Sequence, residues 1–257
     1  MSIPQFQHKQ FIETQIVNLL HDVVSDSNNI SNGMEFYATS GYIMHSLFLR
    51  MTGVQEQKFK CVCWDLATVD YEYRYSRYNK WELGECSKLK DKSTVFSDLV
   101  DAVKAYNPKY SVFGNSAANK TDFLTKTLLE IKSNLDGSNL ANCFPEEYAN
   151  FDDIFSHLHH NNLEAGNQLF CCADNTTFQN MREEHVLAMA YTLLYKHRNR
   201  CAHNTLSYQT NIPTFQELND KYVQKYYNVF LFIAILIVID KMLIQVYRKY
   251  QKVLLEF

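Results

Sequence analysis

Apolar residues recur every three or four positions along much of this chain, and this spacing predicts amphipathic helices. The segments that show it clearly are 4–24, 34–51, 95–106 and 122–135. Two helix ends are marked by Pro108, which disfavours helical geometry in the preceding residue, and by Gly137, which suits the left-handed conformation after a last turn. The polar stretches 25–33 and 111–120 are predicted loops.

The middle of the chain is less regular. Tyr71, Tyr73 and Tyr75 alternate as in a strand, whereas Tyr71, Tyr75 and Tyr78 share one face of a helix. We favour a helix over residues 58–78, because few other segments offer a partner strand. The remaining segments are a predicted charged connector at 80–93 and an irregular region at 138–178, with one short helix near 152–160.

Two long helices are predicted at the C-terminal end, over residues 179–201 and 215–255. About 40 residues is unusually long for one globular helix, so a kink or a break is expected in the second. It contains an apolar run of eleven residues, Val229–Ile239, which spans about 16 Å of helix, or roughly half the thickness of a bilayer. We expect the core and a second subunit to bury this run; a membrane-associated protein anchored by residues 226–247 is the alternative.

Composition agrees with an all-α fold. Gly and Pro, which interrupt regular structure, number only 7 and 4 in 257 residues. The formal net charge is −3, so any contact with RNA must come from a local basic patch. The 7 cysteines are odd in number and form no CxxC pair, and the N-terminus lacks a signal-peptide core. These features favour a cytoplasmic protein with reduced thiols.

Basic and imidazole side chains gather near the end of the predicted helix 179–201. The segment contains Lys196, His197, Arg198, Asn199, Arg200, His203 and Asn204. On a helix, Asn199 and His203 share one face because they are four residues apart, and the long side chain of Arg198 reaches the same region. The plainest interpretation is that cations are common in the last turn of any helix, where they interact favourably with its dipole.

The pattern Arg198-Asn199-x-x-x-His203, followed by a small polar residue, resembles the signature of HEPN (higher eukaryotes and prokaryotes nucleotide-binding) domains. The resemblance covers roughly residues 177–245. It implies an HEPN-like helical bundle with additional helices, which we treat as a single domain over 1–257 with a motif-bearing core at 177–257. Residues 58–175 match no member that we can name and are a candidate for a subfamily-specific insertion.

The resemblance also implies a metal-independent endoribonuclease that acts as a homodimer, with two copies of the motif in one cleft. Arg198, Asn199 and His203 are then the expected catalytic residues, and Lys196, His197, Arg200 and Asn204 the expected RNA-binding residues. No cofactor is expected. Such hydrolases often serve as toxins or antiviral-defence effectors restrained by a partner protein. The alternative is a non-catalytic HEPN module for dimerisation or nucleotide binding.

Two other groups suggest chemistry more weakly. His157, His159 and His160, with Cys171 and Cys172, have the ligand types for zinc but match no structural zinc spacing, so we expect solvated histidines and a buried thiol. The second group is the Tyr-rich segment 71–78, which contains Arg74 and Arg77. Tyrosine and arginine together can stack on bases, but we expect tyrosines in the core and arginines at the surface. The sequence therefore predicts no metal site.

Overall fold

The computed structural model describes residues 8–30, 34–79, 86–114, 116–158, 162–163, 169–170, 185–203 and 219–256, and all regular secondary structure in these ranges is helical. This confirms the all-α class. The helices are α1 (Lys9–Glu13), α2 (Val17–Asn28), α3 (Met34–Val69), α4 (Tyr71–Asn79), α5 (Leu89–Tyr106), α6 (Ala117–Leu135), α7 (Asn139–Cys143), α8 (Pro145–Ser156), α9 (Val186–His203), α11 (Lys221–Tyr226) and α12 (Val229–Glu256).

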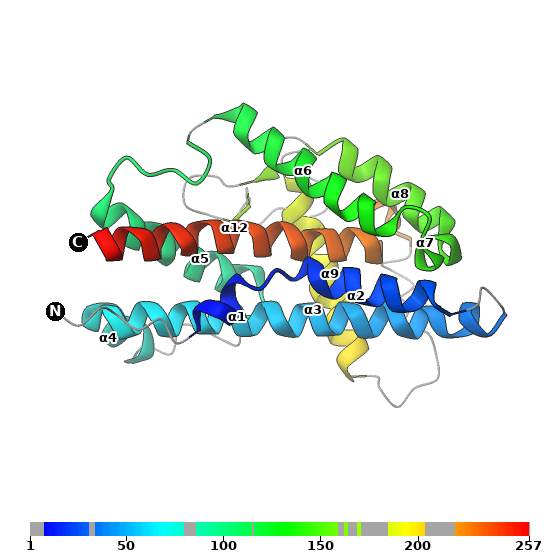
Figure 1. The fold of residues 1–257 in the computed structure, drawn as a ribbon, viewed down its shortest axis with the longest axis horizontal. Helices are drawn as coiled ribbons and strands as arrows, with labels where there is room; N and C mark the ends of the chain where they lie inside the picture. Colours follow the sequence, from blue (N-terminus) through cyan, green and yellow to red (C-terminus); the bar gives the residue numbers. More distant parts are fainter. Residues whose placement is uncertain are drawn as a thin grey trace.

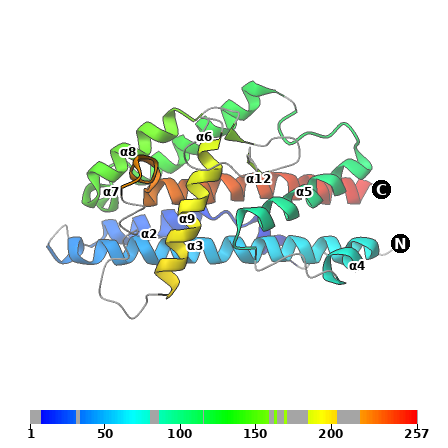
Figure 2. The same ribbon diagram turned by 180° about the vertical axis from the view of Figure 1, so that it is seen from behind.

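Two long helices, α3 and α12, form the axis of the molecule. They lie side by side and run in the same direction (Figure 1). Helix α5 packs against both of them, α6 and α8 cover α12, and α2 lies along α3. Helix α9 crosses both long helices, and its last turn extends past α3 at the edge of the molecule (Figure 2). One continuous cluster of buried apolar side chains includes residues from α1 to α12.

Several predicted loops are shorter than their composition suggested. Helix α3 is continuous through residues 52–57, which joins two segments that were predicted separately. Helix α2 continues to Asn28, inside the predicted loop 25–33, since polar residues also suit the exposed face of a helix. Helix α6 begins inside the predicted loop 111–120, because the Ser116 hydroxyl accepts a hydrogen bond from the Asn119 amide and caps it.

The region predicted to be irregular contains two short helices. Helix α7 begins after Ser138, whose hydroxyl accepts a hydrogen bond from the Ala141 amide. Helix α8 has Pro145 in its first turn, where a missing amide hydrogen costs nothing, and it ends at Ser156. The predicted short helix near 152–160 thus exists but begins seven residues earlier and ends four residues sooner.

The long C-terminal helix is broken, as predicted, between α11 and α12. At the break, the Asn228 side chain accepts a hydrogen bond from the Leu231 amide at 3.1 Å and so caps α12. The break was predicted from length alone, and its position is explained by this asparagine. The predicted start of that helix at 215 and the start of the preceding one at 179 lie outside the described residues.

The apolar run Val229–Ile239 lies in the interior of one chain. Every side chain from Phe230 to Ile239 is at most 1% exposed. The expectation that a second subunit helps to bury this run is therefore wrong, because the run is already buried within one chain, in which α3, α5, α8 and α9 pack against α12. Helix α12 is long and apolar enough to cross a membrane, but 83% of its most apolar 18-residue window is buried within the protein, as in a core helix.

A buried ion pair fixes the register of the two long helices. Lys58 of α3 and Asp240 of α12 are at most 1% exposed, and the lysine Nζ lies 2.6 Å from the aspartate Oδ1. The other carboxylate oxygen accepts a hydrogen bond from the Ile16 amide at 2.8 Å, and Lys58 also donates to the Thr14 carbonyl. Because each charge has partners, this polar interruption of the apolar run is compatible with burial.

Candidate functional site

The residues of the HEPN-like motif lie on the last turns of α9. The buried face of this helix carries Leu187, Ala190, Tyr191, Leu194, His197 and Cys201, which follow the helical repeat. Arg198, Asn199 and Arg200 are half-buried. The motif therefore begins where α9 leaves the core and ends at the edge of the molecule, beyond α3 (Figure 2).

The guanidinium of Arg198 has two polar partners. One terminal nitrogen lies 3.2 Å from Glu56 Oε2 on α3, and the other donates to Asn199 Oδ1 at 3.2 Å. The side chain of Arg198 is 30% exposed and that of Glu56 is 13% exposed. Arg198 and Asn199, two of the three expected catalytic residues, are thus in contact, and a carboxylate that the sequence analysis did not single out holds the arginine.

Two buried groups share the electrostatic environment of this ion pair. Burial lowers the pKa of Lys92 to about 8, although the nearby Glu56 carboxylate acts in the opposite direction. Its ammonium lies 5.1 Å from the centre of the Phe59 ring. Burial, followed by the charge of Glu56, raises the pKa of Tyr191 well above its usual value, and the hydroxyl of this tyrosine donates to the Ser87 carbonyl at 2.7 Å. Glu56 therefore lies among two cations and a phenol.

The third expected catalytic residue, His203, is the last residue of α9. Its backbone is helical, one turn after Asn199, and its side chain lies outside the described part of the structure. The expected RNA-binding residue Asn204 also lies outside the described residues. Among the expected flanking contacts, Lys196 is half-buried, and the Arg200 guanidinium lies 5.5 Å from the centre of the Tyr227 ring.

His197 lies inside the bundle, where it is 2% exposed. Its Nδ1 is 2.6 Å from the Tyr227 hydroxyl, and its ring packs against those of Phe48 and Phe232. Burial, with the nearby His45 and Arg200, lowers the pKa of His197 to about 3, so the imidazole is neutral at physiological pH. A buried, neutral ring does not reach the phosphates of an RNA on the surface. The expected RNA-binding role of His197 is therefore corrected.

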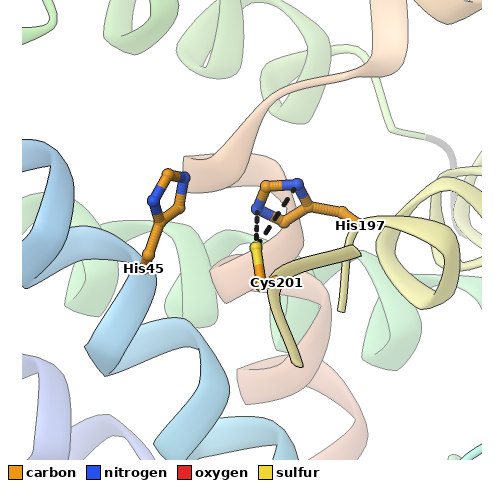
Figure 3. A group of neighbouring side chains, drawn as sticks. All are labelled: His45, His197 and Cys201. Carbon is orange, nitrogen blue, oxygen red and sulfur yellow. Dashed lines mark hydrogen bonds between the residues drawn. The ribbon is translucent and has the colours of Figure 1, made fainter. Parts of the chain in front are cut away.

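A second polar cluster on α9 consists of His197 and Cys201 together with His45 of α3. The Cys201 sulfur lies 3.5 Å from His197 Nε2, and the ligand atoms of all three side chains lie within 4.8 Å of one another. Figure 3 shows the two side chains from α9 and the one from α3 converging on the same space. The sequence analysis missed this cluster, although His197 and Cys201 are four residues apart on the apolar face of α9.

The two weaker suggestions have different outcomes. His159, His160, Cys171 and Cys172 lie outside the described residues, so the zinc group around His157 is not seen as a whole. In α4, the expectation of core tyrosines is wrong for Tyr71 and Tyr75, which are 75% and 64% exposed. Among the α4 tyrosines whose side chains the structure describes, Tyr73 packs inward, and its hydroxyl donates to Asp98 Oδ2 at 3.1 Å.

Comparison of the chain with protein-family models, with curated proteins and with solved structures finds no match. The functional argument therefore depends on the residues themselves and on their arrangement around the end of α9.

Proposed function

We propose that this chain is a metal-independent endoribonuclease of the HEPN type. The observation that carries the proposal is the placement of Arg198 against Asn199, partly exposed, on a helix that ends at His203 at the edge of the molecule. A guanidinium, an amide and an imidazole within about one turn of helix supply the groups that cleavage of RNA requires without a metal.

The chemistry begins with attack of a ribose 2′-hydroxyl on the adjacent phosphate. His203 takes or gives a proton, because an imidazole titrates near neutral pH. Arg198 stabilises the negative charge that develops on the phosphate oxygens, and its planar fork of donors matches their geometry. Asn199 orients Arg198 through their hydrogen bond. The expected products are a 2′,3′-cyclic phosphate and a free 5′-hydroxyl.

The proposal includes a homodimer in which the ends of the two α9 helices face each other across one cleft. Lys196, Arg200 and Asn204 then contact the flanking phosphates. With a formal net charge of −3, the chain has no general attraction for RNA, so these local cations provide the binding. A cytoplasmic toxin or antiviral-defence effector, restrained by a partner protein, is the role that fits such an enzyme.

The Arg198–Glu56 ion pair favours a second candidate function. A guanidinium that is paired with a carboxylate from α3 can simply hold the end of α9 in place. The chain is then a non-catalytic HEPN module for dimerisation or nucleotide binding. The two functions differ in RNA cleavage. Only for the nuclease does loss of a catalytic side chain slow it.

The test is cleavage of a defined single-stranded RNA by purified protein in buffer that contains a chelator. We expect the wild type to cut, and His203→Ala and Arg198→Ala to be slower by about 10²-fold or more. Arg248→Ala removes one exposed cation far from the motif, on α12, and serves as the matched control. A substrate with a 2′-deoxy sugar at the cleaved position should resist cutting.

Cleavage by His203→Ala at the wild-type rate would contradict the catalytic proposal. The non-catalytic module is favoured by a different result. In that case the wild type, Arg198→Ala and His203→Ala all fail to cut RNA, while the wild type still binds RNA or forms dimers.

A further inference from the structure

We propose that His45, His197 and Cys201 form a binding site for a zinc ion that ties α9 to α3. The ligand atoms of these three side chains lie within 4.8 Å of one another, and the side chains point into a common space (Figure 3). Imidazole nitrogen and thiolate sulfur are the donors that zinc prefers in proteins. This site is separate from the proposed RNA cleavage and does not depend on it.

The spacing of the two donors on α9 fits zinc geometry. In a tetrahedral site, with Zn–S about 2.3 Å and Zn–N about 2.0 Å, a sulfur and a nitrogen ligand are about 3.5 Å apart. The Cys201 sulfur and His197 Nε2 are 3.5 Å apart. The two residues are four apart on one helix, so the backbone already holds their side chains on the same face. Both donors can therefore bind one ion without a change in the helix.

The second nitrogen of His197 has a hydrogen-bond partner, as the second nitrogen of a metal-binding histidine usually does. Its Nδ1 lies 2.6 Å from the Tyr227 hydroxyl. A histidine that binds a metal through one nitrogen commonly donates a hydrogen bond from the other, which fixes the tautomer and the orientation of the ring. Donation from Nδ1–H to the Tyr227 oxygen would leave Nε2 unprotonated, 3.5 Å from the Cys201 sulfur, which also lies 4.0 Å from Nδ1.

The environment of His45 and His197 is otherwise apolar. The rings of Phe48 and Phe232 lie 5.0 Å and 5.7 Å from that of His197, and the two imidazole rings are 5.3 Å apart. Within the described part of the chain, no carboxylate lies in this group. A thiol–imidazole contact alone explains two of the three side chains, whereas a shared ion also explains why His45 converges on them.

The proposed ion would have three protein ligands and a water molecule in the fourth position. On binding, the Cys201 S–H bond breaks, sulfur keeps the electron pair as the Zn–S bond forms, and the proton passes to solvent. His45 comes from α3, and the other two ligands come from α9, so the ion links the two helices. Arg198 lies between His197 and Cys201 in the sequence, but its guanidinium is held by Glu56 and Asn199 without the ion, so cleavage in a chelator is still expected.

The test is a titration of the chelator-treated, full-length protein with Co²⁺, a spectroscopic probe for tetrahedral zinc sites. We expect one Co²⁺ per chain, with visible ligand-field bands and a near-ultraviolet sulfur-to-cobalt charge-transfer band, and displacement by Zn²⁺. Cys201→Ser should abolish the charge-transfer band, and His45→Gln should weaken binding by at least about tenfold. Tyr227→Phe keeps all three ligands and should weaken binding less than either change.

Two matched controls keep the test specific. Cys63→Ser removes a different buried thiol, on α3. The double variant Cys171→Ser/Cys172→Ser removes the two cysteines that are neighbours in the sequence. Both variants should bind Co²⁺ as the wild type does. His45 is half-buried, so His45→Gln is expected to fold even if Cys201→Ser does not, and circular dichroism checks this. Wild type without Co²⁺ bands, His45→Gln with undiminished affinity, or a charge-transfer band lost only in the double variant would each overturn the proposal.

Discussion

Arg198 has a carboxylate partner before any RNA is bound. Its pair with Glu56 is partly exposed, with 30% and 13% of the two side chains accessible. Pairs of this kind contribute about 1 kcal/mol or less to stability, because water screens them. A phosphate can therefore replace Glu56 at low cost, or Glu56 can remain and compete with the phosphate for the guanidinium.

Removing the charge of Glu56 should strengthen RNA binding. In Glu56→Gln, the amide can still accept a hydrogen bond from Arg198, but it no longer repels a phosphate or neutralises the guanidinium. We expect the Kd for single-stranded RNA, measured by fluorescence anisotropy in a His203→Ala background, to fall about fivefold, which corresponds to about 1 kcal/mol. Glu146→Gln removes an exposed carboxylate from α8 and should leave the Kd unchanged. Weaker binding by Glu56→Gln would mean that the carboxylate positions the arginine and does not compete for it.

Lys92 is a buried cation whose pKa is low enough for it to lose its proton at mildly alkaline pH. Its side chain is 1% exposed, and burial lowers its pKa from 10.5 to about 8. The unfolded chain keeps its proton up to the higher value, so the unfolded state binds more protons between these two pKa values. Stability consequently rises with pH across this interval, and below it the charged lysine costs about 3 kcal/mol.

The free energy of unfolding should therefore rise by about 1 kcal/mol between about pH 7 and pH 9 because of Lys92. In Lys92→Met this contribution should vanish, and the variant should be more stable than the wild type at the lower pH. Urea unfolding of both proteins at matched pH values measures the difference, in which other titrating groups cancel. The range stops at about pH 9, because Cys86, whose pKa burial raises to about 11, acts in the opposite direction above it. Equal slopes in the two proteins would show that Lys92 is not buried as a cation.

At the residue scale, the sequence predicted that Arg198 reaches the region of Asn199, but neither the hydrogen bond between them nor the carboxylate that holds the arginine. Neighbouring positions on a helix follow from the helical repeat alone. Glu56 is 142 positions from Arg198 in the sequence, and no local pattern connects the two. His197 was misassigned because it was grouped with the basic residues around it. Its spacing from Ala190 and Leu194 places it on the apolar stripe of α9, and that spacing was visible in the sequence.

At the element scale, the pair of long helices depends on one polar contact in an apolar interface. Lys58 and Asp240 are at most 1% exposed and come from α3 and α12. A buried pair contributes little net stability, since desolvation offsets the attraction, but loss of one partner leaves the other charge uncompensated. The pair also brings Ile16 and Thr14 into the same network and so fixes the segment between α1 and α2 against both long helices.

Removal of one partner should cost more than removal of both. We expect Lys58→Met to lower the free energy of unfolding by about 3–5 kcal/mol, and the double variant Lys58→Met/Asp240→Leu to recover most of that loss. Urea denaturation provides the measurement. Lys126→Met breaks an exposed pair with Asp122 on α6 and should cost less than about 1 kcal/mol. A double variant as unstable as Lys58→Met would indicate that the pair itself stabilises the fold.

Helix identity was easier to predict than helix extent. The break before α12 was predicted from length, and α5 and α6 end where Pro108 and Gly137 indicated. The loops at 25–33 and 111–120 were predicted from polar composition, which also describes the exposed face of a helix. Composition does not separate these two cases. Capping contacts such as that of Ser116 do separate them, and they depend on which side chain turns toward which amide.

At the scale of the whole molecule, the burial of α12 changes where a dimer can form. The apolar run was the natural candidate for an interface, and it is already covered within one chain. A dimer that brings two motifs together must instead use the surface around the last turn of α9, where that helix extends past α3. In a composite site of this kind, two differently inactivated chains can restore each other, whereas in a site within one chain they cannot.

Arg198→Ala and His203→Ala chains should complement each other when mixed. A dimer of either variant alone lacks both copies of Arg198 or both copies of His203. A mixed dimer keeps one arginine and one histidine around the same phosphate. We expect an equimolar mixture, exchanged through mild urea and returned to buffer, to recover a measurable part of the wild-type RNA cleavage rate, with mixed dimers forming about half of the population. A mixture with Arg198→Ala/His203→Ala in place of the second variant should recover nothing, which controls for exchange. If sedimentation shows dimers and the mixture stays inactive, each chain carries its own site. If cleavage by the wild type is independent of dilution to the monomer, the composite site is excluded as well.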